Sequence, residues 1–472
     1  MAHAPMVDRS KSFASDTPAR LVPMVWFTCF LAALAGLLFG LDIGVISGAL
    51  PFIARDFQID DSMQEWIVSS MMFGATIGAL TAGMMSQKLG RKYALMVGAA
   101  LFVVGSLLAA AAWTPTVLIV ARVILGLAVG IASFTAPLYL SEIAPERVRG
   151  SMISMYQLMI TIGILAAFLS NTAFSYLQSW RWMLGVITFP ALGLLLGVMV
   201  LPRSPRWLAT KERFEEAQSV LRRLRGSDEE VHSEMTEIRA NLKKGASGWE
   251  LFRQSPAFRR TVALGMVLQV IQQFTGINAV MYYAPRIFDM AGFASTEAQL
   301  WSTVSVGLVN VLATFIAIGL VDRWGRKPIL YTGFLVMGIG MAILGYLLNM
   351  GTGTASMQIF AVAMLLVFVA GFAMSAGPLI WILCSEIQPQ AGRDFGITCS
   401  TVTNWATNMI IGAYFLTTLN TLGGPGTFWA FAALNVVFIL FTLFYVPETR
   451  GVSLEKIEQN LMQGKPLSKL GR

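Results

Sequence analysis

Long apolar runs constrain this chain more than any other feature of its sequence. Stretches of about 20 residues with few charges recur along the 472 residues, and a run of that length crosses the hydrocarbon core of a bilayer as one helix. Only 13% of the residues are charged and 56% are hydrophobic, which excludes an ordinary soluble globule. The sequence predicts twelve membrane-spanning helices, over 24–53, 64–86, 93–113, 116–141, 151–177, 183–201, 257–290, 299–321, 328–349, 357–386, 394–420 and 424–446.

One polar stretch, 202–256, separates the spans into two groups of six. Its charged segments 212–226 and 228–244 are amphipathic and predict short helices outside the membrane. Three motifs then recur at corresponding loops: Gly90-Arg91-Lys92 as Gly325-Arg326-Lys327, Ser141-Glu142-Ile143 as Ser385-Glu386-Ile387, and Pro202-Arg203-Ser204 as Pro447-Glu448-Thr449. The recurrence predicts parallel six-helix repeats, with a substrate bound between the halves near the midplane.

Basic residues fall mainly on one side of the predicted spans. Of the 34 Lys and Arg, Arg55, Arg181 and Arg286 lie on one side and Arg122 lies inside a span, which leaves 30 for the other side. The positive-inside rule therefore places both termini in the cytoplasm. The net charge of +8 indicates topology and contact with anionic membrane lipid, and not a nucleic-acid partner. The predicted organisation is a cytoplasmic tail 1–23, a helix bundle 24–201, cytoplasmic linker helices 202–256, a second bundle 257–446 and a cytoplasmic tail 447–472.

Two charges lie inside apolar runs. Asp42 is near the middle of 21–53, and Arg122 is in 116–140. A charge at membrane depth costs several kcal/mol, so it usually faces a protein interior and has a partner or a task. We expect a buried pair that a proton can open, because the protonation of Asp42 depends on whether the pair is made. The alternative is a static ion pair that fastens two helices.

Carboxamides and tryptophans lie inside five of the predicted spans. They are Gln157, Gln272, Gln273, Asn278, Asn310, Trp381, Asn404 and Trp405. An amide in hydrocarbon needs partners, and one interpretation is that each holds helices together. A sugar site is the other interpretation, because carboxamides donate and accept as hydroxyls do, and Trp covers the apolar face of a pyranose. Gly276 and Gly377 mark points where two of these spans can unwind.

The repeated motifs, with the runs PRSPRW, PETRG, LLFGLDIGVISGALPFI and LQVIQQFTGINAVMYYAPRIF, resemble the sugar-porter branch of the major facilitator superfamily. The resemblance covers essentially the whole chain. It implies sugar contact for the eight residues above, with Phe39 and Gly377 lining the cavity. It also implies a cytoplasmic gating network of charges, formed by Arg91, Glu142, Arg149, Arg326, Glu386, Arg393 and Glu448.

The chain departs from the family pattern at two loop positions. Gln87 stands where the family usually has Asp, and Arg203 where it usually has Glu. Both changes remove an acid from the first half of the charge network. We therefore expect the second-half cluster to hold more strongly.

The resemblance implies symport of a proton with a monosaccharide, galactose or a related hexose, into the cell by alternating access. Passive relatives lack the acid at Asp42, so its presence favours symport over a facilitative uniporter. A pentose such as arabinose is the other candidate substrate, and a transporter-like sensor is disfavoured by the short tails. No ATP-binding G-x-x-x-x-G-K-[ST] motif and no metal-ligand spacing occur in the sequence, so we expect no cofactor and no metal. The two histidines, His3 and His232, lie in the tail and the linker, outside any span, so we expect no enzymatic activity. The expected location is the bacterial inner membrane, with the monomer as the functional unit.

Overall fold

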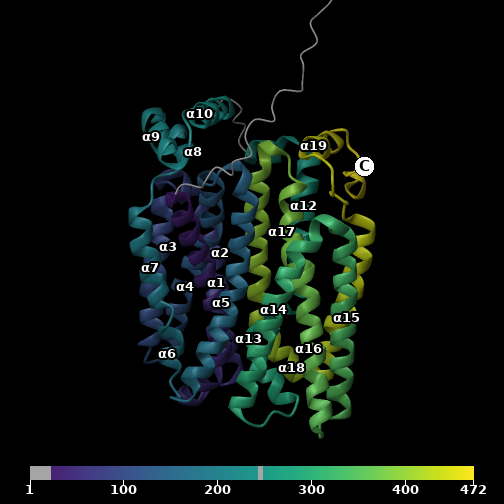
Figure 1. Cartoon of the computed structure of the whole chain (residues 1–472). Coiled ribbons are helices and arrows are strands. Elements are labelled where there is room, and N and C mark those ends of the chain that lie inside the picture. Colours follow the sequence, from purple (N-terminus) through teal and green to yellow (C-terminus); the bar gives the residue numbers. More distant parts are fainter. Residues whose placement is uncertain (1–22, 243–247, 472) are drawn as a thin grey trace, which may run out of the picture.

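Helices form all of the regular structure in the described residues of this computed structural model, 23–242 and 248–471. The first half contains α1 (Pro23–Phe57), α2 (Asp61–Leu89), α3 (Arg91–Ala110), α4 (Pro115–Ile143), α5 (Glu146–Ser175), α6 (Trp180–Gly185) and α7 (Thr188–Val200). The second half contains α12 (Pro256–Phe274), α13 (Ile277–Met290), α14 (Thr296–Trp324), α15 (Arg326–Met350), α16 (Ala355–Met374), α17 (Ala376–Glu386) and α18 (Arg393–Tyr445), with η1 (Gln390–Gly392) before α18. The two halves stand side by side (Figure 1).

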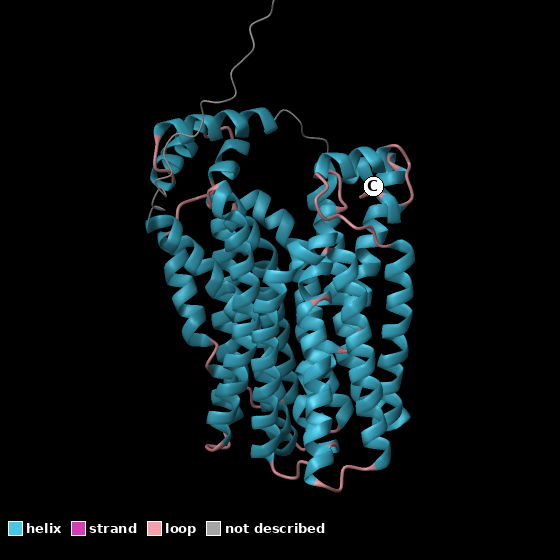
Figure 2. Ribbon diagram, turned by 45° about the vertical axis from the view of Figure 1, so that its right-hand side comes forward, coloured by secondary structure: helices cyan, strands magenta, loops and turns pink. Residues whose placement is uncertain are grey.

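The segment between the halves and the C-terminal segment form a cap of short helices. They are α8 (Pro205–Thr210), α9 (Phe214–Leu224), α10 (Asp228–Leu242), α11 (Gly248–Gln254), α19 (Leu454–Met462) and η2 (Leu467–Lys469). We call the end of the bundle that carries α8–α10 and α19 the linker end, and the opposite end the far end (Figures 1 and 2). Helices α9 and α10 lie within the segments 212–226 and 228–244 that the sequence predicts to be helical. The described residues of the predicted tail, 447–471, are folded: Ile457, Leu461 and Leu470 are buried there.

Eleven helical segments of the described residues are long and apolar enough to cross a membrane, one fewer than predicted. The difference arises in α18, a single 53-residue element that contains the predicted span 394–420 and all but the last residue of the predicted span 424–446. A straight helix of that length would measure about 80 Å, whereas a span needs about 30 Å. Gly423 interrupts it with φ 73° and ψ 169°, which ends one crossing and begins the next, so twelve crossings remain.

Two predicted spans are broken, one at the expected glycine and the other at a position two residues before the expected glycine. Gly276 has φ 95°, a left-handed conformation that favours glycine, and it separates α12 from α13. The other break falls at Ser375, two residues before Gly377, between α16 and α17. Broken helices at membrane depth free backbone groups for neighbours or ligands, and the two breaks lie inside the candidate membrane spans Pro256–Met290 and Ala355–Glu386.

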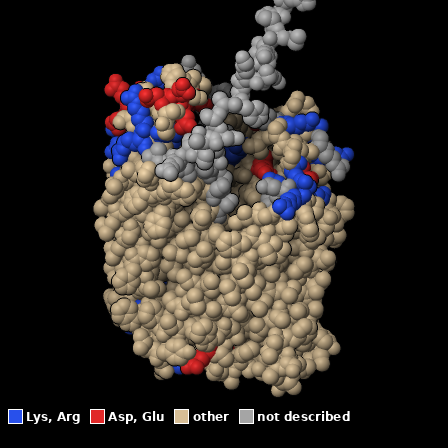
Figure 3. Space-filling model, viewed as in Figure 1, with Lys and Arg blue, Asp and Glu red and all other residues tan. Residues whose placement is uncertain are grey.

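Small residues set the packing of the first half. A Cβ at Gly40 of α1 would lie 2.0 Å from the carbonyl oxygen of Ile160 on α5, and one at Gly126 of α4 would lie 1.9 Å from that of Met71 on α2. Such spacing lets helix backbones approach closely in a membrane bundle. On the face that Figure 3 shows, few charged side chains lie between the two ends, and charged side chains gather at the linker end. Large apolar side chains such as Phe30, Trp66 and Phe444 are exposed on it, as lipid contact requires.

Candidate functional site

The structure brings Asp42 and Arg122 together in the interior of the first half. Arg122 Nη1 on α4 donates to Asp42 Oδ1 on α1 over 3.2 Å, and both side chains are fully buried. Arg122 Nε also donates to the carbonyl oxygen of Ile67 on α2, at 3.5 Å. Asp42 Oδ2 and Arg122 Nη2 are buried without a hydrogen-bond partner among the described residues. The pair is therefore held by one bond and retains an oxygen that can take a proton.

A cavity lies between the two halves, beside the helix that carries Asp42. About 610 Å³ of space there is not filled by atoms, including the part open to solvent. Its lining residues come from α1, α5, α13, α14, α16 and α17 and are Ile43, Gln157, Ile160, Thr161, Ile164, Ile277, Asn278, Met281, Asn310, Thr314, Phe372, Ala373, Gly377 and Pro378. Both halves thus contribute polar and apolar groups to one space.

Three of the predicted sugar-contact residues, Gln157, Asn278 and Asn310, line this cavity, and so does Gly377, as predicted. The other amides stand behind Asn278 in one network. Asn278 Nδ2 donates to Gln273 Oε1 over 2.5 Å, and Asn404 Nδ2 donates to Gln272 Oε1 over 2.8 Å. Gln272 Nε2 donates to the carbonyl oxygens of Ala376 and Gly377, at 2.9 and 3.1 Å. The amide network therefore ties the break between α16 and α17 to α12, α13 and α18.

The three predicted aromatic residues occupy different positions. Phe39 of the first half and Trp405 of the second lie with ring centroids 5.3 Å apart, so they make an aromatic contact between the halves. Trp381 is half-buried on α17, one helical turn after Gly377. None of the three lines the cavity in this structure.

Several residues of the site were not predicted from the sequence. Thr161 and Thr314 line the cavity, as do the isoleucines at 43, 160 and 164. Gln269 is fully buried and accepts a 2.7 Å hydrogen bond from Asn404 Nδ2. Gln269 precedes Gln272 by one turn, and this spacing is the signal that could have identified it.

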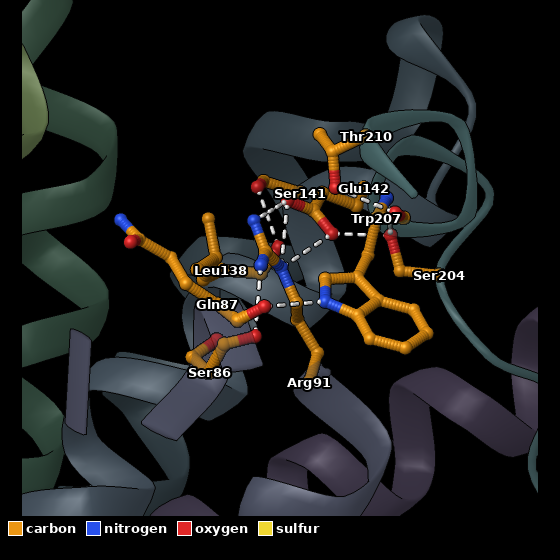
Figure 4. A network of polar contacts seen from close by, with 9 residues as sticks. All are labelled: Ser86, Gln87, Arg91, Leu138, Ser141, Glu142, Ser204, Trp207 and Thr210. Carbon is orange, nitrogen blue, oxygen red and sulfur yellow. Dashed lines mark hydrogen bonds and ion pairs between the residues drawn. The ribbon is translucent and has the colours of Figure 1, made fainter. Parts of the chain in front are cut away.

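Charged clusters at the linker end follow the sequence repeat. In the first half, Arg91 Nε and Nη2 hold the carboxylate of Glu142 at 2.8 to 3.1 Å, and Ser204 Oγ donates to the same carboxylate (Figure 4). In the second half, Arg326 Nη2 donates to Glu386 over 3.0 Å, and Thr449 Oγ1 donates to it over 2.5 Å. Each pair joins helices of one half, so in this structure the clusters brace each half internally.

The remaining network residues differ between the halves. Glu448 accepts hydrogen bonds from the backbone N–H groups of Arg326, Lys327 and Arg450, at 2.9 to 3.0 Å. At the matching position of the first repeat, Arg203 lies over the ring of Tyr93 and donates to its hydroxyl. Arg393 Nε is buried without a partner among the described residues, and the side chain of Arg149 lies outside them.

Gln87, the second departure from the family pattern, contributes its backbone. Its carbonyl oxygen accepts a 2.9 Å bond from Trp207 Nε1, which secures α8 to the end of α2 (Figure 4).

Polar contacts between the two halves lie at the far end, as far as the described side chains show. Glu65 on α2 is buried there and accepts from both the backbone N–H and the hydroxyl of Thr417 on α18, at 2.6 and 2.8 Å. Its neighbour Asp61 accepts from Asn420 over 2.9 Å and lies 3.7 Å from Arg286. These contacts close the far end of the interface between the halves.

Residues 28–461 match the model of the family described as sugar (and other) transporter. The chain belongs to this family. It is 66% identical over 448 residues to the galactose-proton symporter of Escherichia coli K12, covering 95% of this chain and 97% of that protein. It is 57% identical over 451 residues to the arabinose-proton symporter of the same strain, covering 95% and 96%.

Solved structures of a sugar porter share the fold. The xylose transporter XylE from E. coli, in a partially occluded inward open conformation, aligns with a TM-score of 0.80 at 30% identity, covering 91% of this chain and 99% of that one. The same proton:xylose symporter bound to 6-bromo-6-deoxy-D-glucose aligns with a TM-score of 0.76 at 31% identity, covering 94% and 98%. The predicted family and the twelve-helix fold in two six-helix bundles are confirmed.

Proposed function

We propose that this chain imports a monosaccharide, galactose or a related hexose, together with a proton by alternating access. One observation carries the proposal: Asp42, in a buried pair with Arg122, stands on α1, and α1 also borders a cavity lined by amides of both halves. The amides suit a neutral polyol, and the carboxylate suits a proton. The 66% identity to a galactose-proton symporter supports galactose, and the 57% identity to an arabinose-proton symporter keeps a pentose as the alternative.

In the proposed cycle a proton from the outer side neutralises Asp42 and releases Arg122. Sugar then binds among Gln157, Gln273, Asn278 and their neighbours, and the halves rock about the site. Proton and sugar leave on the cytoplasmic side, and the ion pair forms again. No enzymatic step or cofactor is needed, because the transmembrane proton gradient supplies the free energy.

Uptake into vesicles tests this function. Purified protein in liposomes with an imposed pH gradient, acidic outside, should accumulate labelled galactose, and galactose added to vesicles without a gradient should make the medium more alkaline. Uptake without alkalinisation would indicate a facilitative uniporter instead. Competition by a panel of hexoses and pentoses against labelled galactose identifies the preferred sugar, and arabinose as the strongest competitor would favour the pentose alternative.

We also propose that the linker end, with 1–23, 202–256 and 447–472, faces the cytoplasm of a bacterial inner membrane, and that the monomer is the functional unit in contact with membrane lipid. The excess of Lys and Arg at the linker end supports this orientation (Figure 3). It makes the closed far end periplasmic, so the conformation is inward-facing. Similarity to the partially occluded inward open XylE supports the same assignment.

Cysteine labelling tests the orientation. Gly226 in the linker and Gly353 at the far end are both exposed, and a Cβ added at either meets no atom within 4 Å. In intact cells, Gly353→Cys should react with a membrane-impermeant maleimide, whereas Gly226→Cys should react only after the membrane is opened. The unsubstituted protein controls for the three native cysteines. Labelling of Gly226→Cys from outside intact cells would overturn the orientation.

A further inference from the structure

Two threonines line the cavity but are not among the site residues predicted from the sequence. Thr161 on α5 and Thr314 on α14 both line the cavity, and both are buried. Each follows an amide of the cavity lining by four residues, Thr161 after Gln157 and Thr314 after Asn310. Residues four apart share one face of a helix, so each half presents an amide and a hydroxyl as neighbours.

The hydrogen bonds of these hydroxyls limit what they can offer a ligand. Thr161 Oγ1 donates to the carbonyl oxygen of Leu158, and Thr314 Oγ1 donates to that of Asn310, each over 2.8 Å. A hydroxyl has one proton to donate and two lone pairs that accept. With the proton used inside the helix, each threonine can only accept a hydrogen bond from a ligand, whereas the neighbouring amides can both donate and accept.

The two helices face each other across the interface between the halves. A Cβ at Gly307 on α14 would lie 2.9 Å from the ring of Phe168 and 3.1 Å from the Cα of Leu165, both on α5. Asn310 and Thr314 continue α14 from this contact toward the linker end, as Thr161 and Gln157 continue α5. One acceptor from each half therefore borders the same cavity.

We propose that Thr161 and Thr314 bind the sugar as hydrogen-bond acceptors and determine specificity by requiring a hydroxyl donor at two ligand positions. The inference rests on the proposed sugar site and adds two residues to it. A buried acceptor left without a donor costs free energy, so a ligand that carries fluorine in place of the matching hydroxyl binds less tightly. Fluorine is similar in size to a hydroxyl and has no proton to donate.

The experiment measures the affinity of the purified full chain for galactose and for each mono-deoxyfluoro-galactose. Thr161→Val and Thr314→Val keep the branched shape and remove the hydroxyl. In the unsubstituted protein, one fluorinated sugar per threonine should bind roughly 5- to 100-fold more weakly than galactose. The corresponding valine variant should bind galactose more weakly by a similar factor and should not discriminate further against that one analogue, as expected for two changes that remove the same interaction.

Matched controls exist on the same two helices. Thr172 on α5 and Thr303 on α14 are buried and donate to their own helix, to Phe168 and Gln299, but do not line the cavity. Thr172→Val and Thr303→Val should bind every sugar within about twofold of the unsubstituted protein, because their hydroxyls make no ligand contact. Thr161→Ser and Thr314→Ser keep the hydroxyl and should retain the fluorosugar profile, which covers the case of a valine variant that fails to fold.

The outcomes separate the inference from the proposed function. If the unsubstituted protein binds no monosaccharide, the proposed function fails. If it binds galactose but Thr161→Val and Thr314→Val behave as the Thr172 and Thr303 controls do, the inference fails while the function stands. Weaker binding by the valine variants with an unchanged preference among the fluorinated sugars would indicate a structural role and would also overturn the inference.

Discussion

The two halves of this transporter differ most at their centres. The first half holds an ion pair, Asp42 with Arg122, joined by one hydrogen bond; one oxygen and one nitrogen of the pair have no partner among the residues that the structure describes. The second half holds neutral amides that are hydrogen-bonded to one another and to the backbone. The side chain of Gln272, for example, donates to two carbonyl oxygens and accepts from Asn404. A bonded neutral network resists change, whereas an incompletely bonded ion pair responds to a proton. This difference is the basis of our proposal that the proton binds in the first half and that most sugar contacts come from the second.

At the linker end, by contrast, the two halves have the same arrangement of hydrogen bonds around a buried or partly buried glutamate. Glu142 and Glu386 each accept from an arginine and from a hydroxyl, and the partners occupy matching positions of the repeat. The two halves differ at one pair of equivalent positions: Arg203 contacts Tyr93, whereas Glu448 accepts hydrogen bonds from three backbone N–H groups. The two repeats therefore share the arginine–glutamate pairs at the linker end, whereas they differ at their centres and at the loop position of Arg203 and Glu448.

The largest effect is expected for Asp42→Asn, which tests whether the ion pair of the first half couples transport to the proton. Asparagine keeps the size and can still hydrogen-bond, but it cannot exchange a proton or form an ion pair. We expect the variant to bind sugar and exchange it across the membrane, yet to lose all accumulation against a gradient, because nothing then ties the return of the empty carrier to proton release. Counterflow and uptake into vesicles with an imposed pH gradient measure the two activities separately.

Asp228→Asn provides a control for this prediction, because it removes an exposed acid whose surface ion pair at 3.6 Å contributes little. It should accumulate sugar normally. Arg122→Ala should also lose accumulation, with more loss of stability, since it leaves Asp42 buried without its cation. Full accumulation by Asp42→Asn would mean that the ion pair is structural only.

A smaller effect is expected at the amide network. Gln273→Ala, Asn278→Ala and Trp381→Ala should each weaken sugar binding by about 1–3 kcal/mol, because a sugar hydroxyl loses its buried partner or its apolar face loses its cover. Calorimetry on purified protein measures the change.

Asn435→Ala is the matched control for the amide variants. Asn435 is also a fully buried amide in the second half, bonded within α18 and outside the cavity, so its loss should leave affinity unchanged. Unchanged sugar binding in all three site variants would favour the alternative interpretation, in which the amides only hold helices together.

The sequence alone predicted the spans and the amides because both depend on composition and local spacing. Twelve apolar runs must cross the membrane, and Gln157 or Asn310 is conspicuous in hydrocarbon. Thr161 was missed because a threonine bonded to its own helix looks ordinary in a membrane segment. The contact of Glu65 with Thr417 joins residues far apart in the chain, so only the arrangement of the halves reveals it.

The smallest expected effect concerns the loop position at which the two repeats differ, Arg203 in the first and Glu448 in the second. Glu448 accepts from the first two backbone N–H groups of α15, a place where a negative charge is stabilised by the helix dipole, by roughly 0.3–1 kcal/mol at an exposed site and about 2 kcal/mol in a partly buried one. Glu448→Gln should therefore lower the apparent melting temperature of the purified protein slightly, and Arg203→Gln should lower it less, since Arg203 caps no helix. Thermal scans at one fixed rate compare the two variants. An equal or larger loss for Arg203→Gln would contradict the expectation, raised by the missing first-half acid, that the second-half cluster holds more strongly.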